Sequence, residues 1–220
     1  MAYVLGFIFA DGAIEDCRRS SRTCYIQLTN NNKDLLWEVR NVIQSNHRLY
    51  FRSPHSRKFG DKTYHCKGTY NLRVGSKVIY KDLLSYGLCP RKSLVIKLPV
   101  IPEMLFSFFL RGYFDGDGCV NVYKKRIRVI FTSGSKIFLE QVAEQINARG
   151  LIRCDRRCFR LIYDRALALN VLDIIYQDLN EVPYLKKKYN IYQDFLRTQF
   201  PLRPHLTPTV FLARIRPDEN

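Results

Sequence analysis

The sequence predicts an α+β protein built from two copies of one αββαββα half-domain. A nonapeptide motif occurs twice, at Val4 to Gly12 and at Leu110 to Gly118, about half the chain length apart. The same order of strand and helix patterns follows each copy. With 220 residues and 46% hydrophobic content, the chain has ample material for a core, as one large domain or two small ones.

Each motif is itself expected to be a helix, and the elements after it follow from hydrophobic periodicity. In the first half we expect strands at 17–19 and 23–29, a helix at 34–46, strands at 49–52 and 69–74, and a helix at 76–86. In the second half we expect strands at 119–123 and 127–132, a helix at 136–148, strands at 151–154 and 158–163, and a helix at 165–179.

Punctuating residues set the limits of these elements. Ser76 is expected to cap a helix that Gly87 ends. Residues 53–68, rich in His, Lys, Arg and Gly, are expected to form a long loop that the second half lacks. The expected parts are an N-terminal half-domain at 1–98, a proline-punctuated linker at 99–102, a C-terminal half-domain at 103–200 and an irregular tail at 201–220.

The charge balance indicates a polyanionic partner. Thirty-six Lys and Arg against 20 Asp and Glu give a net charge of +16 and a pI near 9.7. The basic residues alternate with Val, Ile, Tyr and Phe, so we expect a folded basic surface and not a basic tail.

The cysteines and the apolar runs indicate where the protein works. Seven cysteines without a CxxC pair argue against a disulfide scaffold or a zinc site and favour a reducing compartment. No apolar run resembles a membrane span, and the apolar start lacks the basic region of a signal peptide. We therefore expect an intracellular protein that does not associate with membranes.

Small residues recur four positions apart in both motifs, which predicts two helices in close contact. The small pairs are Gly6 with Ala10 and Gly112 with Gly116. Gly12 and Gly118 are expected in the left-handed conformation that ends many helices. The apolar neighbours are expected to pack into their own half-domains: Leu5, Ile8, Leu110 and Phe114.

Close contact of the two helices would place Asp11 and Asp117 side by side at their C-terminal ends. A carboxylate there is disfavoured by roughly 0.3–1 kcal/mol, and two facing carboxylates repel each other. Divalent cations relieve both costs, and oxygen ligands indicate Mg²⁺. Two acids, a phosphate and metal ions make a two-metal hydrolytic centre. Asp115 aligns with Phe9, so it is expected to be structural or solvating.

The two nonapeptides resemble the LAGLIDADG signature, and the order of elements after each resembles the core of that family from Val4 to Leu196. The resemblance implies two saddle-shaped antiparallel sheets joined through paired motif helices and lying in the DNA major groove. It implies a Mg²⁺-dependent homing endonuclease that cuts both strands of a long site and leaves short 3′ overhangs. Since one chain carries both motifs, it implies a monomer acting on an asymmetric site.

Site residues follow from this resemblance and from the paired acids. The metal ligands are expected at Asp11 and Asp117, with Ala10 and Gly116, around two or more Mg²⁺ ions; Mn²⁺ would substitute and Ca²⁺ would support binding without cleavage. The resemblance further implies a basic residue near each scissile phosphate and a water-ordering polar residue in each half. The basic residues would lie in the loop after the last helix of each repeat, at Lys92 in the first half and at Lys188 in the second, with Lys187 as the alternative to Lys188. The polar residues would be Asn30 and Ser133, which are also candidates for helix N-caps.

Alternation along the strands separates buried from DNA-facing side chains. Ile127, Val129 and Phe131 are expected to face the helices, as are Ile26 and Leu28. Arg and Lys can pair with guanine and Gln with adenine, and other members can hold phosphates. The expected DNA-binding residues are Arg18, Arg19, Arg22, Tyr25, Gln27, Arg52, Arg73, Asn121, Tyr123, Lys125, Arg126, Arg128, Arg153 and Arg160.

Two other readings fit the same fold: an RNA maturase acting on an intron, or a DNA-binding regulator that does not cut. Retention of both acids and both lysines favours cleavage. An intein-embedded nuclease is disfavoured because no splicing-type Cys start or His-Asn end is present. A free-standing, intron-encoded enzyme is preferred, although a nuclease domain taken from a larger chain would look the same.

Overall fold

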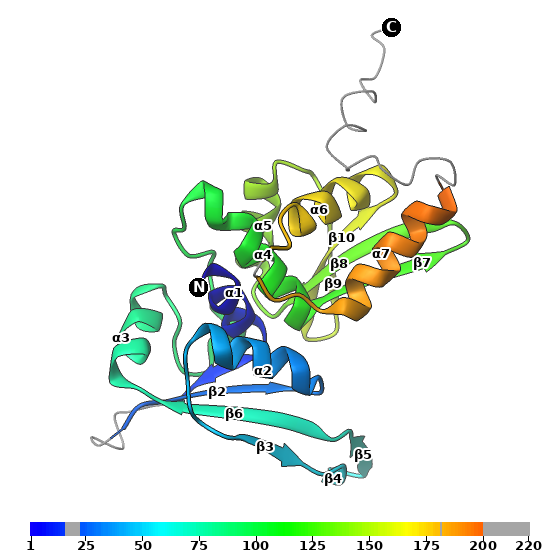
Figure 1. The fold of residues 1–220 in the computed structure, drawn as a ribbon. Coiled ribbons are helices and arrows are strands. Elements are labelled where there is room, and N and C mark those ends of the chain that lie inside the picture. The colour runs from blue at the N-terminus through cyan, green and yellow to red at the C-terminus, as the bar shows by residue number, and fades with distance from the viewer. Residues whose placement is uncertain (16–22, 181, 200–220) are drawn as a thin grey trace, which may run out of the picture.

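The computed structural model describes residues 1–15, 23–180 and 182–199, which form two sheets with helices around a central helix pair (Figure 1). In chain order the elements are α1 (Ala2–Asp11), β1 (Gly12–Ile14), β2 (Tyr25–Asn30), α2 (Lys33–Val42), β3 (Leu49–Arg52), β4 (His55–Phe59), β5 (Lys62–Cys66), β6 (Thr69–Gly75), α3 (Lys77–Ser85), η2 (Lys92–Leu94), α4 (Glu103–Asp117), β7 (Gly118–Tyr123), β8 (Arg126–Ser133), α5 (Lys136–Ile146), β9 (Leu151–Asp155), β10 (Cys158–Asp164), α6 (Ala166–Tyr176) and α7 (Lys186–Gln199).

Each half contributes one four-stranded antiparallel sheet, in the orders β1-β2-β6-β3 and β7-β8-β10-β9. The two orders are equivalent once the extra hairpin β4–β5 of the first half is set aside. The predicted α+β fold with duplicated αββαββα halves is therefore confirmed. In Figure 1, α1 and α4 lie between the two sheets, and the N-terminus is near the centre of the molecule.

The first strand of each sheet follows its motif helix without a loop. In the first half this strand is β1, whose Ala13 pairs with Gln27 of β2. The strand predicted at 17–19 lies outside the described residues, and the strand that pairs with β2 comes earlier. The left-handed end predicted for both motif helices is wrong: Gly12 has φ −89° and Gly118 has φ −95°, both extended.

Each motif helix ends at a glycine because there is no room for a Cβ atom at that position, and not because the backbone has a positive φ angle. A Cβ at Gly12 would lie 2.5 Å from the Ile8 carbonyl oxygen, and one at Gly118 would lie 2.5 Å from that of Phe114. Each distance is shorter than any ordinary carbon–oxygen contact. The chain can pass directly from helix into strand only without a side chain at this position.

Local capping explains the limits of several helices. Ser76 accepts a hydrogen bond from Ile79 N at 3.2 Å, which confirms the predicted N-cap of α3. The second helix is shorter than predicted, since α2 ends at Val42 and Gln44 already has a φ of 52°. In the second half α5 ends where Asn147 adopts a φ of 55°, a left-handed end that Asn tolerates better than most residues.

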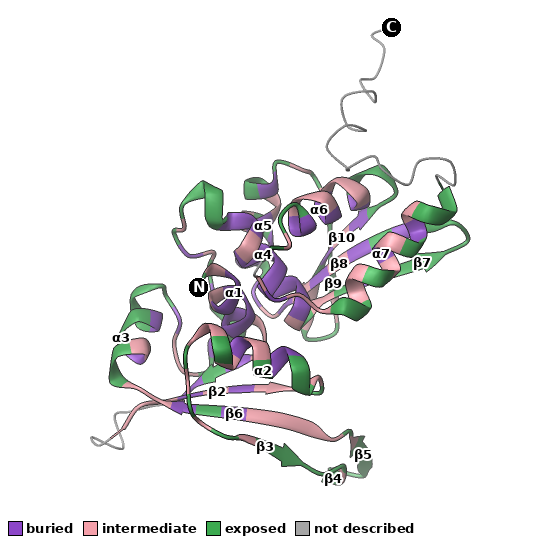
Figure 2. Cartoon of the chain, in the orientation of Figure 1, coloured by how far each residue is buried: buried purple, intermediate pink, exposed green. Residues whose placement is uncertain are grey.

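The long loop predicted for residues 53–68 is wrong, because these residues form the hairpin β4–β5. Phe59 pairs with Lys62 across a turn in which Gly60 has a φ of +57°. Alternating side chains and a glycine at the turn permit this pairing. The hairpin side chains are mostly exposed, at the end of the first sheet farthest from the helix pair (Figures 1 and 2).

Burial concentrates on α1, α4 and the inner faces of the sheets (Figure 2). Ile127, Val129 and Phe131 are 0% exposed, and Ile26 and Leu28 are nearly so, as the strand alternation predicts. Each such side chain contributes roughly 1.5–3 kcal/mol when removed from water. The opposite face of each sheet carries polar and charged side chains, and no helix of the described residues covers it. In the part of the chain that the structure describes, no helix combines the length and apolarity needed to cross a membrane.

Candidate active site at the paired helix ends

The two motif helices touch through their glycines. A Cβ at Gly6 would lie 1.9 Å from the Phe109 carbonyl oxygen, and one at Gly112 would lie 2.0 Å from the Tyr3 carbonyl oxygen. Further along, a Cβ at Gly116 would lie 2.4 Å from the Cβ of Ala10. The predicted small-residue faces therefore bring backbone against backbone along α1 and α4.

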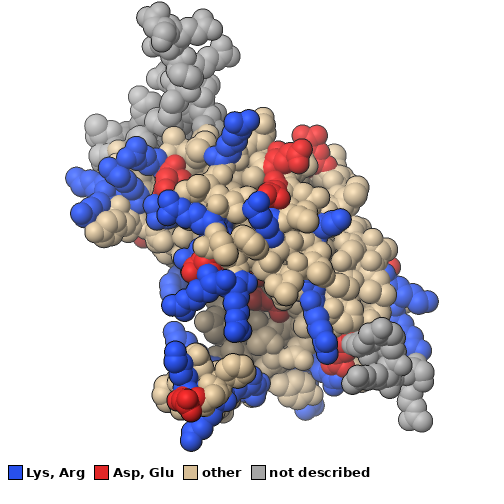
Figure 3. Space-filling view, turned by 180° about the vertical axis from the view of Figure 1, so that it is seen from behind, with Lys and Arg blue, Asp and Glu red and all other residues tan. Residues whose placement is uncertain are grey.

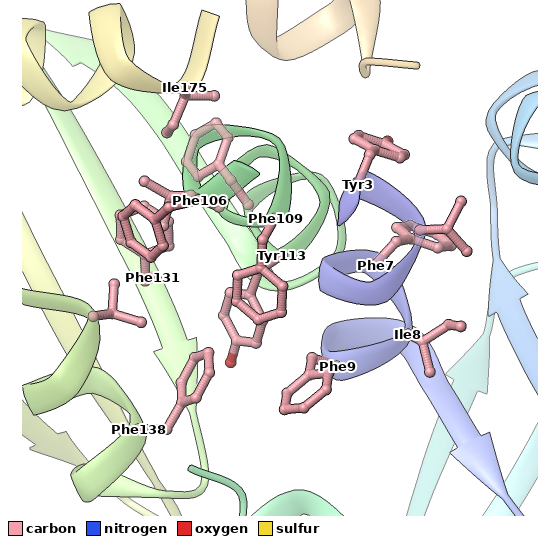
Figure 4. Close-up of a cluster of buried hydrophobic side chains, with 14 of the residues drawn as sticks. Tyr3, Phe7, Ile8, Phe9, Phe106, Phe109, Tyr113, Phe131, Phe138 and Ile175 are labelled. Carbon is pink, nitrogen blue, oxygen red and sulfur yellow. The ribbon is translucent and has the colours of Figure 1, made fainter. Parts of the chain in front are cut away.

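Aromatic side chains surround this contact and hold the pair in place (Figure 4). The Phe9 ring lies edge-on to Phe109, with centroids 5.4 Å apart, and Tyr113 packs on Phe138 at 4.5 Å. Such pairs contribute ~0.5–1.5 kcal/mol beyond area burial. Phe9 and Tyr113 belong to opposite motif helices, and both rings lie at the contact. The cluster thus fixes the relative position of the two helix ends.

This packing brings Asp11 and Asp117 together, as predicted. The carboxyl carbon of Asp11 lies 3.3 Å from the position that a Cβ on Gly116 would occupy, next to Asp117. Asp11 is half-buried, whereas Asp117 keeps contact with solvent. The Asn30 amide at the end of β2 donates to Asp11 Oδ2 at 2.5 Å.

Burial raises the pKa of both acids, and for Asp117 the nearby charge of Asp11 adds to the rise. Loss of water around its carboxylate and the charge of Asp11 raise the pKa of Asp117 to about 6, against the opposing effect of Lys92 and Lys188. Desolvation also raises the pKa of Asp11, and the bond from Asn30 limits that rise. The pair therefore has a high electrostatic cost that a bound cation would lower.

A lysine lies at the end of each motif helix. Lys92, which is 6% exposed, donates through Nζ to the carbonyl oxygens of Phe9 and, at 3.0 Å, Ala10. Lys188 donates to the carbonyl oxygens of Phe114, Asp115 and Gly118. Burial lowers the pKa of both ammonium groups, while the aspartates raise it. Each lysine thus neutralises the negative end of its own motif helix.

Several sequence-based expectations change in detail. Lys188 lies in the first turn of α7, a helix that sequence periodicity did not predict, and not in a loop. The Ala10 carbonyl, expected as a metal ligand, accepts the bond from Lys92. Lys187 is exposed.

The two residues expected to order water occupy matching strand ends but differ in their contacts. The idea that they cap helices is wrong: the N-caps are Asn32 and Ser135, each two residues further along. Asn30 contacts Asp11, whereas the buried Ser133 hydroxyl accepts a bond from Ser135 N at 3.1 Å. Of these two residues, Asn30 is the one with a hydrogen bond to an acid of the site.

The donor set suits Mg²⁺. Within residues 1–15, 23–180 and 182–199 no three His, Cys, Asp or Glu side chains gather into a metal cluster. Magnesium is usually held by one or two carboxylates, with water and substrate phosphates completing its octahedron. Asp11 and Asp117 supply two carboxylates with raised pKa values at an open position, so the residues fit an ion shared with a phosphate.

The free faces of both sheets carry most of the expected DNA-binding side chains. Pairing places Gln27 beside Arg73 in the first sheet and Asn121 beside Arg128 in the second. Figure 3 shows Lys and Arg side chains around a hollow between the two halves. Arg18, Arg19 and Arg22 lie outside the described residues. The exposed members are Arg52, Arg73, Asn121, Tyr123, Lys125, Arg126, Arg128, Arg153 and Arg160, and the half-buried ones are Tyr25 and Gln27.

Three of these arginines are already paired with carboxylates. Arg73 binds Glu15 through two bonds of 2.9 Å and stacks on Tyr25. Arg128 binds Asp164 at 2.5 Å, and Arg160 lies 2.6 Å from Asp155. A phosphate or a base edge would have to compete with these carboxylates. Sequence reasoning did not foresee the pairs, because their partners come from neighbouring strands or loops.

The sequence also gave little indication of two buried polar contacts, one made by Arg111 and one between Tyr3 and Asp115. Arg111 of α4 is 0% exposed and donates through Nε to the Ile175 carbonyl at 2.7 Å. Tyr3 of α1 donates to Asp115 at 2.8 Å. The only sequence signal was that the second motif carries an arginine and an extra acid where the first carries Leu5 and Phe9.

Comparison with known proteins bears on the fold of the chain. Residues 107–178 match the family model of the LAGLIDADG-like domain. A probable translation initiation factor IF-2 of Methanocaldococcus jannaschii is 30% identical over 142 residues; the match covers 63% of this chain and 10% of that relative. The chain thus spans about a tenth of the length of the curated relative it matches.

Solved structures resemble the chain over nearly its full length. A K262A mutant of I-SmaMI gives a TM-score of 0.59 at 15% identity, covering 96% of this chain and 95% of that one. The I-LtrWI LAGLIDADG homing endonuclease bound to target DNA gives 0.55 at 14% identity, with 100% and 97% covered. The homing endonuclease I-WcaI bound to its DNA recognition sequence gives 0.56 at 17%, with 86% and 84% covered. With two motif helices in one chain, this protein has the fold of the single-chain LAGLIDADG homing endonucleases.

Proposed function

We propose that this protein is a Mg²⁺-dependent, site-specific endonuclease that cuts both strands of a long asymmetric DNA target and leaves short 3′ overhangs. The observation that carries the proposal is the pair Asp11 and Asp117, held together by α1 and α4 and flanked by one lysine in each half. A purely structural helix pair would gain nothing from two facing carboxylates at its C-terminal ends. Two of the similar structures are described as bound to their DNA targets.

The site residues have separate tasks in this proposal. Asp11 and Asp117 would hold Mg²⁺, which when bound activates water and stabilises the charge that develops on the phosphate. Asn30 holds the Asp11 carboxylate in one orientation through its bond of 2.5 Å. Lys92 and Lys188 both lie close enough to act on the charge of Asp117, and in this proposal each would stabilise one scissile phosphate.

The two sheets would provide the binding energy and the specificity. A net charge of +16 favours contact with the DNA backbone, and the free sheet faces offer Gln27, Asn121 and several arginines to base edges. Because both halves of the site come from one chain, the protein would act as a monomer. The two faces carry different side chains, so the two half-sites would differ in sequence.

A cleavage-site selection tests this function. A randomised DNA library is incubated with the protein and Mg²⁺, and cut ends are sequenced; Asp11→Asn and Asp117→Asn serve as matched variants. We expect wild type to select and cut one long site, and both variants to bind it without cutting. Ca²⁺ should support binding alone. Specific binding by wild type without any cut would contradict the nuclease proposal and favour a non-cleaving DNA-binding protein.

A further inference from the structure

Asp115, the acid present only in the second motif, links three separate segments. Its side chain is 2% exposed, and Oδ2 accepts hydrogen bonds from the Tyr3 hydroxyl and from Leu185 N, both at 2.8 Å. These donors belong to α1 and to the residue directly before α7. A buried carboxylate is retained only when such bonds offset its desolvation. The carboxylate therefore fixes the start of α7 against both motif helices.

Leu185 in turn forms the first turn of α7, which carries Lys188. Its carbonyl oxygen accepts from Lys188 N at 2.9 Å and from Tyr189 N at 3.2 Å. The Lys188 ammonium group then donates to the carbonyl oxygens of Asp115 in α4, at 3.0 Å, and of Gly118 at the start of β7, at 2.6 Å. Asp115 thus makes two contacts with the Lys188 segment. Its carboxylate accepts a bond from the backbone of Leu185, and its main-chain carbonyl accepts a bond from the Lys188 ammonium group.

The first half holds its lysine by other means. Phe9 occupies the position that corresponds to Asp115, is 1% exposed and packs against aromatic rings. Lys92 begins the short helix η2, between the buried Leu88 and Ile96. The Ile96 carbonyl accepts a bond of 2.7 Å from the Ser135 hydroxyl of the second half. Among the residues that the structure describes, a carboxylate anchors the segment of the second lysine and none bonds to that of the first.

We propose that Asp115 is a positioning residue for Lys188, acting through Leu185 and the first turn of α7. The inference rests on the proposed nuclease function, in which each lysine serves one scissile phosphate. Loss of the anchor should then slow cleavage of one DNA strand and leave the other nearly unchanged. A merely structural role for Asp115 would slow both strands together, because both aspartates depend on the same helix pair.

The test compares strand-specific cleavage. Asp115→Ala removes the acceptor, and Asp115→Asn keeps an amide oxygen that can accept the bond from Leu185 N. Lys188→Met and Lys92→Met identify the strand that each lysine serves. End-labelled DNA of the selected site gives the rate for each strand under single-turnover conditions with Mg²⁺. We expect Asp115→Ala to slow the Lys188-dependent strand by about 10- to 100-fold, since small displacements of a catalytic group cost that much. The other strand should change by less than about threefold, and Asp115→Asn should restore most of the lost rate.

Amide hydrogen exchange measures the anchor without cleavage. In the free protein, Asp115→Ala should speed exchange at residues 185–189 and leave residues 92–96 unchanged. Equal slowing of both strands, or unchanged exchange at 185–189, would overturn the positioning role. A wild-type protein that cuts no DNA would instead count against the proposed nuclease, and the exchange data would still decide whether Asp115 anchors α7.

Discussion

Gly6 of α1 lies so close to Phe109 of α4 that no side chain fits between the two backbones. The ideal Cβ at Gly6 would be 1.9 Å from the Phe109 carbonyl oxygen, and Gly112 shows the reciprocal relationship with Tyr3 at 2.0 Å. Backbone has little freedom to yield at either point. The same contact that joins the two halves also fixes the separation of Asp11 and Asp117.

Adding a methyl group at this contact should therefore destabilise the protein and disturb the site. We expect Gly6→Ala to lower the free energy of unfolding by about 1–3 kcal/mol or more, measured by urea titration. Lys81→Ala, on the exposed face of α3, is a suitable control and should change stability by less than about 0.5 kcal/mol. A Gly6→Ala protein as stable as wild type would contradict the close approach.

The paired acids should make stability depend on pH. The pKa of Asp117 is about 6 in the folded protein and lower when unfolded, so between roughly pH 4 and pH 6 the folded state binds more protons. Stability should therefore fall as pH rises through this range. Asp117→Asn removes one contributor and should flatten the profile, while Asp11 and Asp115 retain part of it.

Unfolding at several pH values checks this expectation. Mg²⁺ at neutral pH should raise the melting temperature of wild type and not that of Asp117→Asn, because only a folded carboxylate pair binds the ion tightly. If Mg²⁺ raised the melting temperature of both proteins equally, the cation would bind at a site other than the pair of Asp11 and Asp117.

Lys92→Met should separate catalysis from DNA binding. The variant removes a buried ammonium group from the carbonyl oxygens of Phe9 and Ala10. Leaving these acceptors unpaired should cost about 1–3 kcal/mol of stability. The cleavage rate of one strand should fall by about 100-fold, as when a charge-stabilising donor is removed, while binding in Ca²⁺ changes little. Nicked DNA should accumulate on gels, and loss of both strands at the same rate would argue against one lysine per phosphate.

The ion pair between Arg128 and Asp164 should compete with DNA for the guanidinium group of Arg128. Both side chains are about half exposed, so the pair contributes little to stability. We expect Asp164→Ala to strengthen DNA binding several-fold and to steepen its salt dependence, because it removes a negative charge and releases Arg128. Arg128→Ala should weaken binding.

Fluorescence anisotropy at several salt concentrations measures both effects. Glu140→Ala is the matched control, because it breaks the pair between Lys136 and Glu140 on α5 and removes the same negative charge as Asp164→Ala. An equal response in this control would mean that total charge alone, and not the sheet face, governs binding.

The sequence by itself determined the duplication, the αββαββα order of each half, and the pairing of Asp11 with Asp117, but not the hairpin β4–β5 or the helix α7. These features are local or repeated: hydrophobic periodicity defines each element, and two equal motifs imply equivalent positions. It also predicted the inward faces of both sheets, because a strand alternates regardless of its partners.

Tertiary structure alone decided the contacts that join distant segments. Tyr3 and Leu185 both donate to Asp115 only because α1, α4 and the start of α7 converge, and no local pattern encodes that convergence. Likewise Arg128 binds Asp164 because their strands pair. Residues 55–66 form a hairpin, although their sequence pattern is equally compatible with a loop. Polar partners of this kind depend on distance and desolvation in the folded protein, which become defined only when the chain has packed.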